Sequence, residues 1–402
     1  MLALNGGPKV RTQPFPRWPE YDETENLALA RALQQGEWGR HGGKEVQAFE
    51  REFAEFGQAP AALAVTNGSH ALELALELAG IEPGDEVIVP AYTFVATSTA
   101  VQRRGGVPVP VDITHDTFCL DPEALEDAVT DRTRAVIPVH IGGHVADMDA
   151  ITAWADARGV TVIQDAAQAH GATWHGKGLG ALGSISTFSF QSTKVITAGE
   201  GGALLLPDPD TYEDAWVRHN CGRTRELHLA VAASNFRVSE LTAALLRAQL
   251  ARFADQNARR AARYTELAAA LGEIPGIRLQ GRDPRCTSTP HYMTTFVLDQ
   301  DELGGLDRDT VALALLMEGI PAFGSHQPLH RTDAFWTGAT RDVRPEELAE
   351  YCPHAERVGR DGVLIGHQAL LGTRQDVDDV ATAVAKVLDE LPRTGTGTGP
   401  AA

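Results

Sequence analysis

A lysine, an aspartate and a glycine-serine turn each follow an apolar, strand-like run, and side chains of these types together could support carbanion chemistry. Lys194 comes shortly after an apolar run that contains Phe188 and Phe190. A lysine shielded from water beside a cationic group is a nucleophilic amine that forms a Schiff base with an aldehyde. A lysine on the surface is the simpler interpretation of Lys194 taken alone.

Asp165 follows the apolar run 160–163, and Gln168 lies three residues further on. A carboxylate at the end of a strand can pair with a pyridinium nitrogen and keep it protonated, so that the ring accepts electrons from a forming carbanion. Gln168 could bind the phenolic oxygen of the same ring. In isolation, Asp165 could equally be a cap for the helix that follows.

The third site is the turn Thr66-Asn67-Gly68-Ser69-His70, between a strand-like run and a helical pattern. Backbone N–H groups at a helix N-terminus, together with a serine hydroxyl, suit a phosphate group. Ser189, five residues before Lys194, could reach the same phosphate. A plain capping turn has the same composition. An amine, a ring-facing carboxylate and an anion site together predict pyridoxal 5′-phosphate (PLP) as the cofactor.

The elements that must position these residues alternate between strand and helix over the first two thirds of the chain. Apolar runs predict strands at 61–66, 86–90, 107–111, 134–139, 160–164, 186–190 and 203–206, and helices at 69–78, 122–129 and 148–157. Strands separated by crossover helices indicate a largely parallel sheet covered on both faces. Ligands of such sheets bind beyond the carboxyl ends of the strands, where the three sites fall.

The pattern changes after Val238. Residues 239–271 predict one long helix, and the part that follows mixes strands, such as 293–298, with helices at 310–318 and 377–388. We expect a large cofactor-binding domain with an N-terminal segment over 1–255, a small C-terminal domain over 256–391 and a disordered tail over 392–402.

Two other motifs do not fit their usual context. Gly178-Leu179-Gly180-Ala181-Leu182-Gly183 matches the dinucleotide pattern G-x-G-x-x-G, but a strand-like run follows it where that motif requires a helix. We therefore interpret it as a hairpin turn. His140 and His144 have no adjoining carboxylate or cysteine cluster, so structural roles are expected for both, and no metal site is predicted.

Composition and charge indicate which kinds of molecule the protein binds and in which compartment it works. The formal net charge is −19, with 54 acidic against 35 basic residues, which disfavours nucleic acid and anionic membrane surfaces. The four cysteines are far apart, as expected for free thiols in a reducing cytoplasm. No signal peptide and no apolar run long enough for a membrane helix is visible. We expect a cytoplasmic protein that acts on a small molecule.

Four motifs, taken in order, resemble the DegT/StrS family of PLP-dependent sugar and cyclitol aminotransferases. They are Thr66-Asn67-Gly68-Ser69, Pro90-Ala91-Tyr92-Thr93-Phe94, Asp165-Ala166-Ala167-Gln168-Ala169-His170-Gly171, and the stretch from Phe188 through Lys194 to Gly202. The resemblance spans about Phe15 to Leu388. It implies an α/β fold of the aspartate aminotransferase type (fold type I), with a mostly parallel seven-stranded sheet and a smaller α+β C-terminal domain.

The resemblance also implies roles for individual residues. Lys194 would hold PLP as a Schiff base and move the proton during transamination, and Asp165 would pair with the ring nitrogen. The remaining cofactor contacts would come from Gly68, Ser69 and Ser189 at the phosphate, Phe94 stacked on the ring, Gln168 at the phenolic oxygen, and Asn235 at the phosphate of the neighbouring subunit's cofactor. A homodimer with shared active sites is therefore implied. Lysine at position 194 favours full transamination, because relatives that dehydrate deoxysugars carry histidine there.

The leading hypothesis for function is a ping-pong aminotransferase that moves an amino group from L-glutamine or L-glutamate to a cyclic ketone, a keto-sugar or keto-cyclitol, in natural-product biosynthesis. An alternative is a PLP dehydratase or aromatising lyase of the aminohydroxybenzoate-forming type, a branch of the family that Cys221-Gly222-Arg223 and His291-Tyr292-Met293 also resemble. That branch has histidine where this chain has Gln168. A third alternative is a non-catalytic regulator. In either enzyme, we expect Arg223 and His326 to contact the acceptor.

Overall fold

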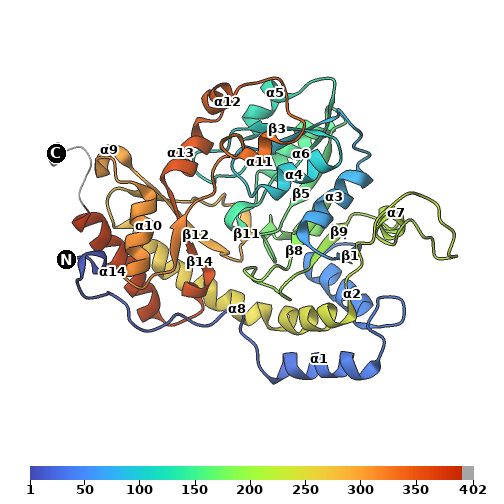
Figure 1. The fold of residues 1–402 in the computed structure, drawn as a ribbon, viewed down its shortest axis with the longest axis horizontal. Coiled ribbons are helices and arrows are strands. Elements are labelled where there is room, and N and C mark those ends of the chain that lie inside the picture. The colour runs from blue at the N-terminus through green and yellow to red at the C-terminus, as the bar shows by residue number, and fades with distance from the viewer. Residues whose placement is uncertain (392–402) are drawn as a thin grey trace.

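The computed structural model describes residues 1–391, and the predicted disordered tail at 392–402 lies outside the described residues. Two main sheets organise the described chain, one of seven strands and one of four, and the long helix α8 (Glu240–Gly272) runs beneath both (Figure 1). A further sheet of three short strands lies beside them.

The large sheet has the strand order β1-β9-β8-β5-β4-β2-β3. Its strands are β1 (Ala61–Val65), β2 (Glu86–Pro90), β3 (Val107–Val111), β4 (Thr133–Val136), β5 (Thr161–Asp165), β8 (Ile185–Ser189) and β9 (Gly202–Leu206). The pairings from β8 through β5, β4 and β2 to β3 are parallel, and β9 runs antiparallel to both β8 and β1. The predicted mostly parallel seven-stranded sheet is therefore confirmed.

Both faces of this sheet are covered by helices, because successive side chains of each strand point to opposite faces. In β1, Leu63 and Val65 join the apolar cluster that contains α3 (Gly68–Leu78). The intervening Ala62 and Ala64 join the cluster that contains Phe49 and Phe53 of α2 (Glu45–Gly57). Helices α4 (Ala96–Arg103), α6 (Met148–Asp156) and α7 (Pro209–His219) complete the two layers.

The small sheet is antiparallel, with the order β10-β12-β14-β13. Its strands are β10 (Ile277–Leu279), β12 (Met293–Leu298), β13 (Ala322–Gly324) and β14 (Gly362–Gly366). Phe296 and Val363 of this sheet pack in one cluster with residues of α10 (Arg308–Met317) and α14 (Arg374–Glu390). The predicted boundary between positions 255 and 256 falls inside the continuous helix α8, and the division into domains stays a prediction.

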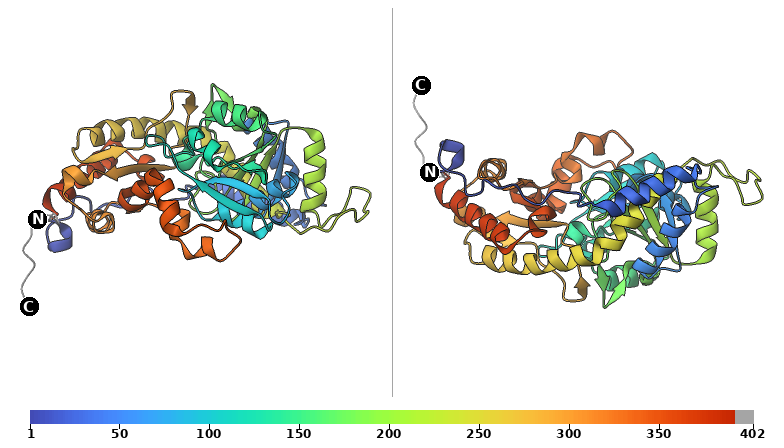
Figure 2. Two further views of the ribbon diagram at one scale, coloured as in Figure 1. Left: turned by 90° about the horizontal axis from the view of Figure 1, so that it is seen from above. Right: turned by 90° about the horizontal axis from the view of Figure 1, so that it is seen from below.

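The remaining helices are short or peripheral. They are α1 (Glu23–Gln35), which lies along α8, α5 (Leu125–Ala128), α9 (Gln300–Leu303), α11 (Asp333–Trp336), α12 (Pro345–Tyr351) and α13 (Pro353–Asp361), with 3₁₀ turns η1 (Ala3–Asn5), η2 (Pro122–Ala124), η3 (Ile141–Gly143), η4 (Leu179–Leu182), η5 (Leu329–Arg331) and η6 (His367–Leu370). The loop after α7 projects away from the rest of the chain in every view (Figures 1 and 2).

Two predicted elements differ from the structure. The run 178–183 is not a hairpin, because the short strand β7 (Lys177–Gly178) pairs with β6 (Thr173–Trp174), and the 3₁₀ turn η4 leads from β7 into β8. The predicted helix at 122–129 is split into η2 and α5, because Pro122 starts a tight 3₁₀ turn at its N-terminus.

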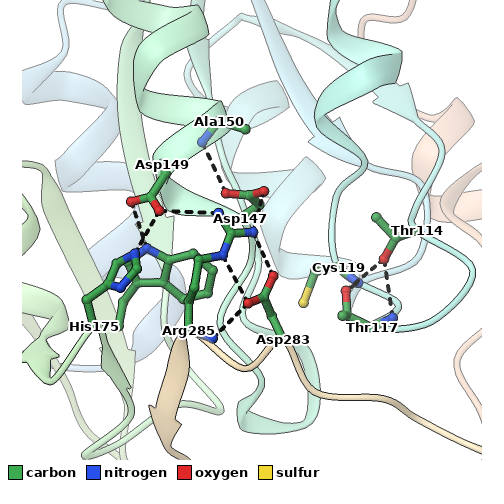
Figure 3. A network of polar contacts seen from close by, with 10 residues as sticks. Thr114, Thr117, Cys119, Asp147, Asp149, Ala150, His175, Asp283 and Arg285 are labelled. Carbon is green, nitrogen blue, oxygen red and sulfur yellow. Dashed lines mark hydrogen bonds and ion pairs between the residues drawn. The ribbon is translucent and has the colours of Figure 1, made fainter.

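Arg285 links the three-stranded sheet to helix α6, which packs against the large sheet (Figure 3). Just before β11 (Cys286–Ser288), its guanidinium contacts carboxylates of Asp147, Asp149 and Asp283 at 2.6 to 3.2 Å. It also lies 4.6 Å from the ring centroid of Trp174 in β6. Asp147 is the N-cap of α6, so this network fixes the start of that helix.

Candidate active site

The predicted site residues converge because they follow the ends of neighbouring strands. Asp165 ends β5 and Ser189 ends the parallel neighbour β8. Strand β9 is antiparallel to β1, and Gly202 at its start packs against the backbone of Asn67 and Gly68 after β1. One edge of the large sheet therefore brings these residues together.

Asp165 is buried, with 6% of its surface exposed. It accepts hydrogen bonds from the Thr97 hydroxyl at 2.8 Å and from the Ala167 N–H at 3.2 Å. Burial raises the pKa of Asp165, and the two hydrogen bonds and the positive charge of Lys194 act in the opposite direction. A buried carboxylate of this kind suits a cationic partner, because a counter-charge offsets its desolvation.

The turn after β1 forms a cradle at the N-terminus of α3. The Asn67 side chain accepts a hydrogen bond from the His70 N–H at 2.8 Å, and the N–H groups of Gly68 and Ser69, at the start of α3, have no partner within the helix. A Cβ atom at Gly68 would lie 2.7 Å from the Cβ atom of Ser189, so glycine is required for this close approach. Ser69 is exposed beside it. The turn is at the position where the sequence predicts an anion site, and that role stays a prediction.

Lys194 lies in a turn closed by a hydrogen bond from its N–H to the Gln191 carbonyl, at 2.9 Å. The side chain is half-buried, and Nζ lies 4.6 Å from the centroid of the Tyr292 ring. The positive charge of Lys194 acts to lower the pKa values of Asp165, His170 and His326.

Gln168 is oriented by one backbone contact. Its Oε1 accepts a hydrogen bond from the Gly142 N–H at 2.7 Å, so the donor Nε2 is the side-chain group left to meet a ligand oxygen. His140, in the same region, has its Nε2 3.0 Å from Gln164 Oε1 and accepts a bond from Ala146 through Nδ1. Burial lowers the pKa of His140 to about 4, as expected for a neutral structural histidine.

Of the other predicted site residues, Phe94 and His326 lie close together, whereas Arg223 and Asn235 lie on an exposed loop. Phe94 is 55% exposed, and its ring centroid lies 5.8 Å from that of His326, whose pKa is lowered by burial and by Lys194. The structure therefore brings Phe94 and His326 together. Arg223 and Asn235 are exposed in the loop after α7, and among the described residues neither forms a hydrogen bond or ion pair with Lys194 or Asp165.

The family model for the DegT/DnrJ/EryC1/StrS aminotransferases matches residues 19–385. The chain belongs to this family. It is 47% identical over 380 residues to 3-amino-5-hydroxybenzoate synthase of Amycolatopsis mediterranei (strain S699), covering 92% of this chain and 96% of that protein. It is 38% identical over 413 residues to L-glutamine:2-deoxy-scyllo-inosose aminotransferase of Micromonospora echinospora, covering 96% and 97%.

The fold is also similar to a solved structure. The crystal structure of 3-amino-5-hydroxybenzoic acid (AHBA) synthase superposes with a TM-score of 0.91 at 46% identity, covering 95% of this chain and 100% of that one. Family membership confirms the predicted enzyme class, an aminotransferase, and the predicted cofactor PLP. Within residues 1–391, no helix combines the length and apolar character that a membrane crossing requires.

Sequence reasoning assigns no role to two residues that contact the site. Thr97 binds Asp165, and Tyr292 lies against Lys194. Thr97 follows Phe94 by one helical turn, so a search for hydroxyls after the motif 90–94 could have found it. Tyr292 immediately precedes β12 of the small sheet, 98 residues beyond Lys194, and no local pattern predicts its contact.

Proposed function

We propose that this chain is a PLP-dependent aminotransferase that moves an amino group from L-glutamine or L-glutamate to a cyclic ketone, with Lys194 as its Schiff-base lysine. The observation that carries the proposal is that Lys194 follows β8, the parallel neighbour of β5, and that β5 ends in Asp165, a buried carboxylate suited to a cationic partner. Of the five lysines in the chain, Lys194 alone follows a strand of the large sheet at this edge.

The residues present fit the cofactor. Gly68, Ser69 and Ser189 would hold its phosphate, because Gly68 and Ser69 begin helix α3 and Ser189 lies directly against Gly68. Asp165 would pair with the ring nitrogen, and Gln168 Nε2 would donate to the phenolic oxygen while Gly142 holds Oε1. Phe94, exposed beside His326, would stack on the ring. When bound, PLP supplies an electron sink for a carbanion beside nitrogen.

The chain's own residues then have separable tasks. The Lys194 amine, once free, would take the proton from the substrate carbon and return it, as general base and then acid. The Thr97 hydroxyl, which donates to Asp165 Oδ2 from α4, would hold the Asp165 carboxylate in position for the ring nitrogen. Burial of this carboxylate strengthens its interaction with a cation, since the local dielectric is low.

A homodimer would complete the site. Asn235 and Arg223 are exposed on the loop after α7, neither forms a hydrogen bond or ion pair with Lys194 among the described residues, and Leu227 in the same loop is 72% exposed. We propose that Asn235 reaches the phosphate of the partner's cofactor and that Arg223 contacts the partner's acceptor. His326, next to Phe94, would contact the acceptor within the chain.

A second candidate is favoured by the comparisons. Similarity to 3-amino-5-hydroxybenzoate synthase, at 47% identity, exceeds that to the inosose aminotransferase, at 38%. The same site would then dehydrate and aromatise an aminated ring after the proton has left the substrate carbon. Both candidates need Lys194 and Asp165, and they differ in the product.

Absorbance spectroscopy tests the proposal. Purified protein with PLP should absorb in the visible region, borohydride should fix the cofactor to a peptide containing Lys194, and L-glutamine should bleach the absorption if transamination occurs. A cofactor fixed to another lysine contradicts the proposal. Mass analysis of the products formed from a cyclic ketone and from an aminated cyclic substrate then separates the two candidates, because only aromatisation removes water.

A further inference from the structure

Two side chains from the small sheet reach the turn that carries Lys194. Tyr292 immediately precedes β12 and His367 immediately follows β14, and Met293 pairs with Gly366 at this end of the antiparallel ladder. Strand pairing therefore places Tyr292 and His367 next to each other, with ring centroids 6.0 Å apart. The small sheet presents the two rings to a loop of the large sheet.

Tyr292 contacts both the amine and the residue before it. Lys194 Nζ lies 4.6 Å from the centroid of the Tyr292 ring, and the hydroxyls of Tyr292 and Thr193 lie 2.9 Å apart. An ammonium over the face of an aromatic ring is attracted by the quadrupole of that ring. Burial holds the Tyr292 ring in place, so its face gives the amine a defined position.

His367 holds the backbone of the same turn. Its Nε2 lies 3.1 Å from the Thr193 carbonyl, and because a carbonyl only accepts, Nε2 carries the proton. Burial lowers the pKa of His367 to about 3, so the ring is neutral at neutral pH and keeps one donor there. Trp18 packs edge-on against His367 at 4.5 Å and donates from Nε1 to the Ser192 carbonyl at 3.0 Å.

We propose that Tyr292 and His367 are positioning residues that fix the Lys194 amine at the cofactor site, Tyr292 through its ring face and His367 through the Thr193 carbonyl. The inference rests on the proposed role of Lys194. The proposal has a structural consequence, because both residues directly adjoin strands of the small sheet. The amine is correctly placed only while the small sheet is docked against the large one.

Nuclear magnetic resonance of the cofactor-free protein tests the contact without any turnover. The chain has five lysines, so labelling lysine with ¹³C at Cε gives few signals, and the Lys194→Arg variant assigns the one of interest; the five are Lys9, Lys44, Lys177, Lys194 and Lys386. The ring current of Tyr292 should shift the Lys194 ε-methylene signal upfield. Tyr292→Phe should keep this shift and Tyr292→Leu should abolish it. A wild-type Lys194 signal at the position of exposed lysines overturns the proposal, even if Tyr292→Leu does not fold.

The rate of cofactor uptake by the same protein, followed by absorbance, gives a second readout. Tyr292→Leu and His367→Leu should slow it by roughly 10-fold, because each loses a contact that orders the turn. Tyr292→Phe should stay near wild type, as should the control Tyr351→Leu, which changes a side chain 74% exposed on α12. If Lys194→Arg abolishes uptake while Tyr292→Leu leaves it unchanged, only the positioning role fails. If Lys194→Arg still takes up PLP normally, the proposed function fails.

Discussion

Thr97 and Asp165 are 68 residues apart in the chain, and their side chains meet in a buried hydrogen bond of 2.8 Å. Thr97 Oγ1 also lies 3.0 Å from the hydroxyl of Thr93, so a short chain of hydroxyls leads from α4 to the carboxylate. Because Thr97 donates to Asp165, the Thr93 hydroxyl is the donor in the other contact. The pair links the motif around Phe94 to the residue proposed to bind the cofactor's nitrogen.

Replacing Thr97 with valine tests this link, because valine has nearly the same shape and no donor. We expect the PLP dissociation constant of Thr97→Val, measured by absorbance titration, to rise about 10-fold, the usual effect of losing a hydrogen bond to a charged group. Thr99→Val, two residues further along α4, is the matched control and should bind PLP like wild type. Equal affinities for the two variants would mean that Thr97 does not support the cofactor.

Gly68→Ala probes the phosphate cradle. The new Cβ atom would lie 2.7 Å from the Cβ atom of Ser189, so either α3 or the end of β8 must move. Overpacking of this kind costs about 1–3 kcal/mol, and we expect PLP affinity to fall about 10-fold or more. Gly272→Ala at the end of α8 meets open space and is the control. Isothermal titration of both variants gives the comparison, and normal binding by Gly68→Ala contradicts the assigned cradle.

The strands of the large sheet could be predicted because each is a short apolar run between turn residues. Positions 86–90 and 107–111 have the bounds of β2 and β3, and Met293–Leu298 is the predicted strand 293–298. The fold class also predicts that the residues following these strands lie close together, because the carboxyl ends of parallel strands meet at one edge of the sheet. Most of the proposed cofactor contacts were accessible in this way.

What could not be predicted depends on contacts between distant segments. No element was expected before position 61, although α2 carries Val46, Phe49 and Phe53 at helical spacing on its buried face. The Tyr292 contact requires the small sheet to dock against the large one, and sequence spacing does not encode that docking. The side chains of Arg223 and Asn235 are exposed, and the roles proposed for them depend on a partner subunit, which sequence spacing does not describe.

Arg40→Met tests a buried ion pair beneath the large sheet. Arg40 Nη2 lies 2.8 Å from Glu50 Oε2, and Glu50 Oε1 accepts a bond from the Ala64 N–H at 2.9 Å. Leaving Glu50 without its counter-charge should lower the free energy of unfolding by about 3 kcal/mol in urea denaturation. Burial already raises the pKa of Glu50, so the loss should be larger at pH 8 than at pH 5.

The double variant R40M/E50Q is the internal control for that measurement. The glutamine side chain that Glu50→Gln introduces would keep an acceptor for the Ala64 N–H and carry no charge, so most of the lost stability should return. A double variant no more stable than Arg40→Met would show that packing of the arginine, rather than the charge of Glu50, accounts for the effect.

Asp165→Asn should have opposite effects on stability and on cofactor binding. The pKa of Asp165 is raised in the folded protein by burial, so in the cofactor-free state its contribution is favourable below the unfolded pKa and is lost as pH rises through the folded pKa. Asparagine carries no charge to bury, so the Asp165→Asn variant does not lose this stability as pH rises. We expect the cofactor-free variant to unfold at higher temperature than wild type at pH 8, with the difference shrinking toward pH 4, while PLP affinity and turnover fall sharply.

Calorimetry at both pH values measures the effect on stability, and absorbance titration measures the effect on PLP binding. If Asp165→Asn destabilised the cofactor-free protein at pH 8, the carboxylate would already be satisfied by Thr97 and Ala167, and its requirement for a cationic ligand would be disproved.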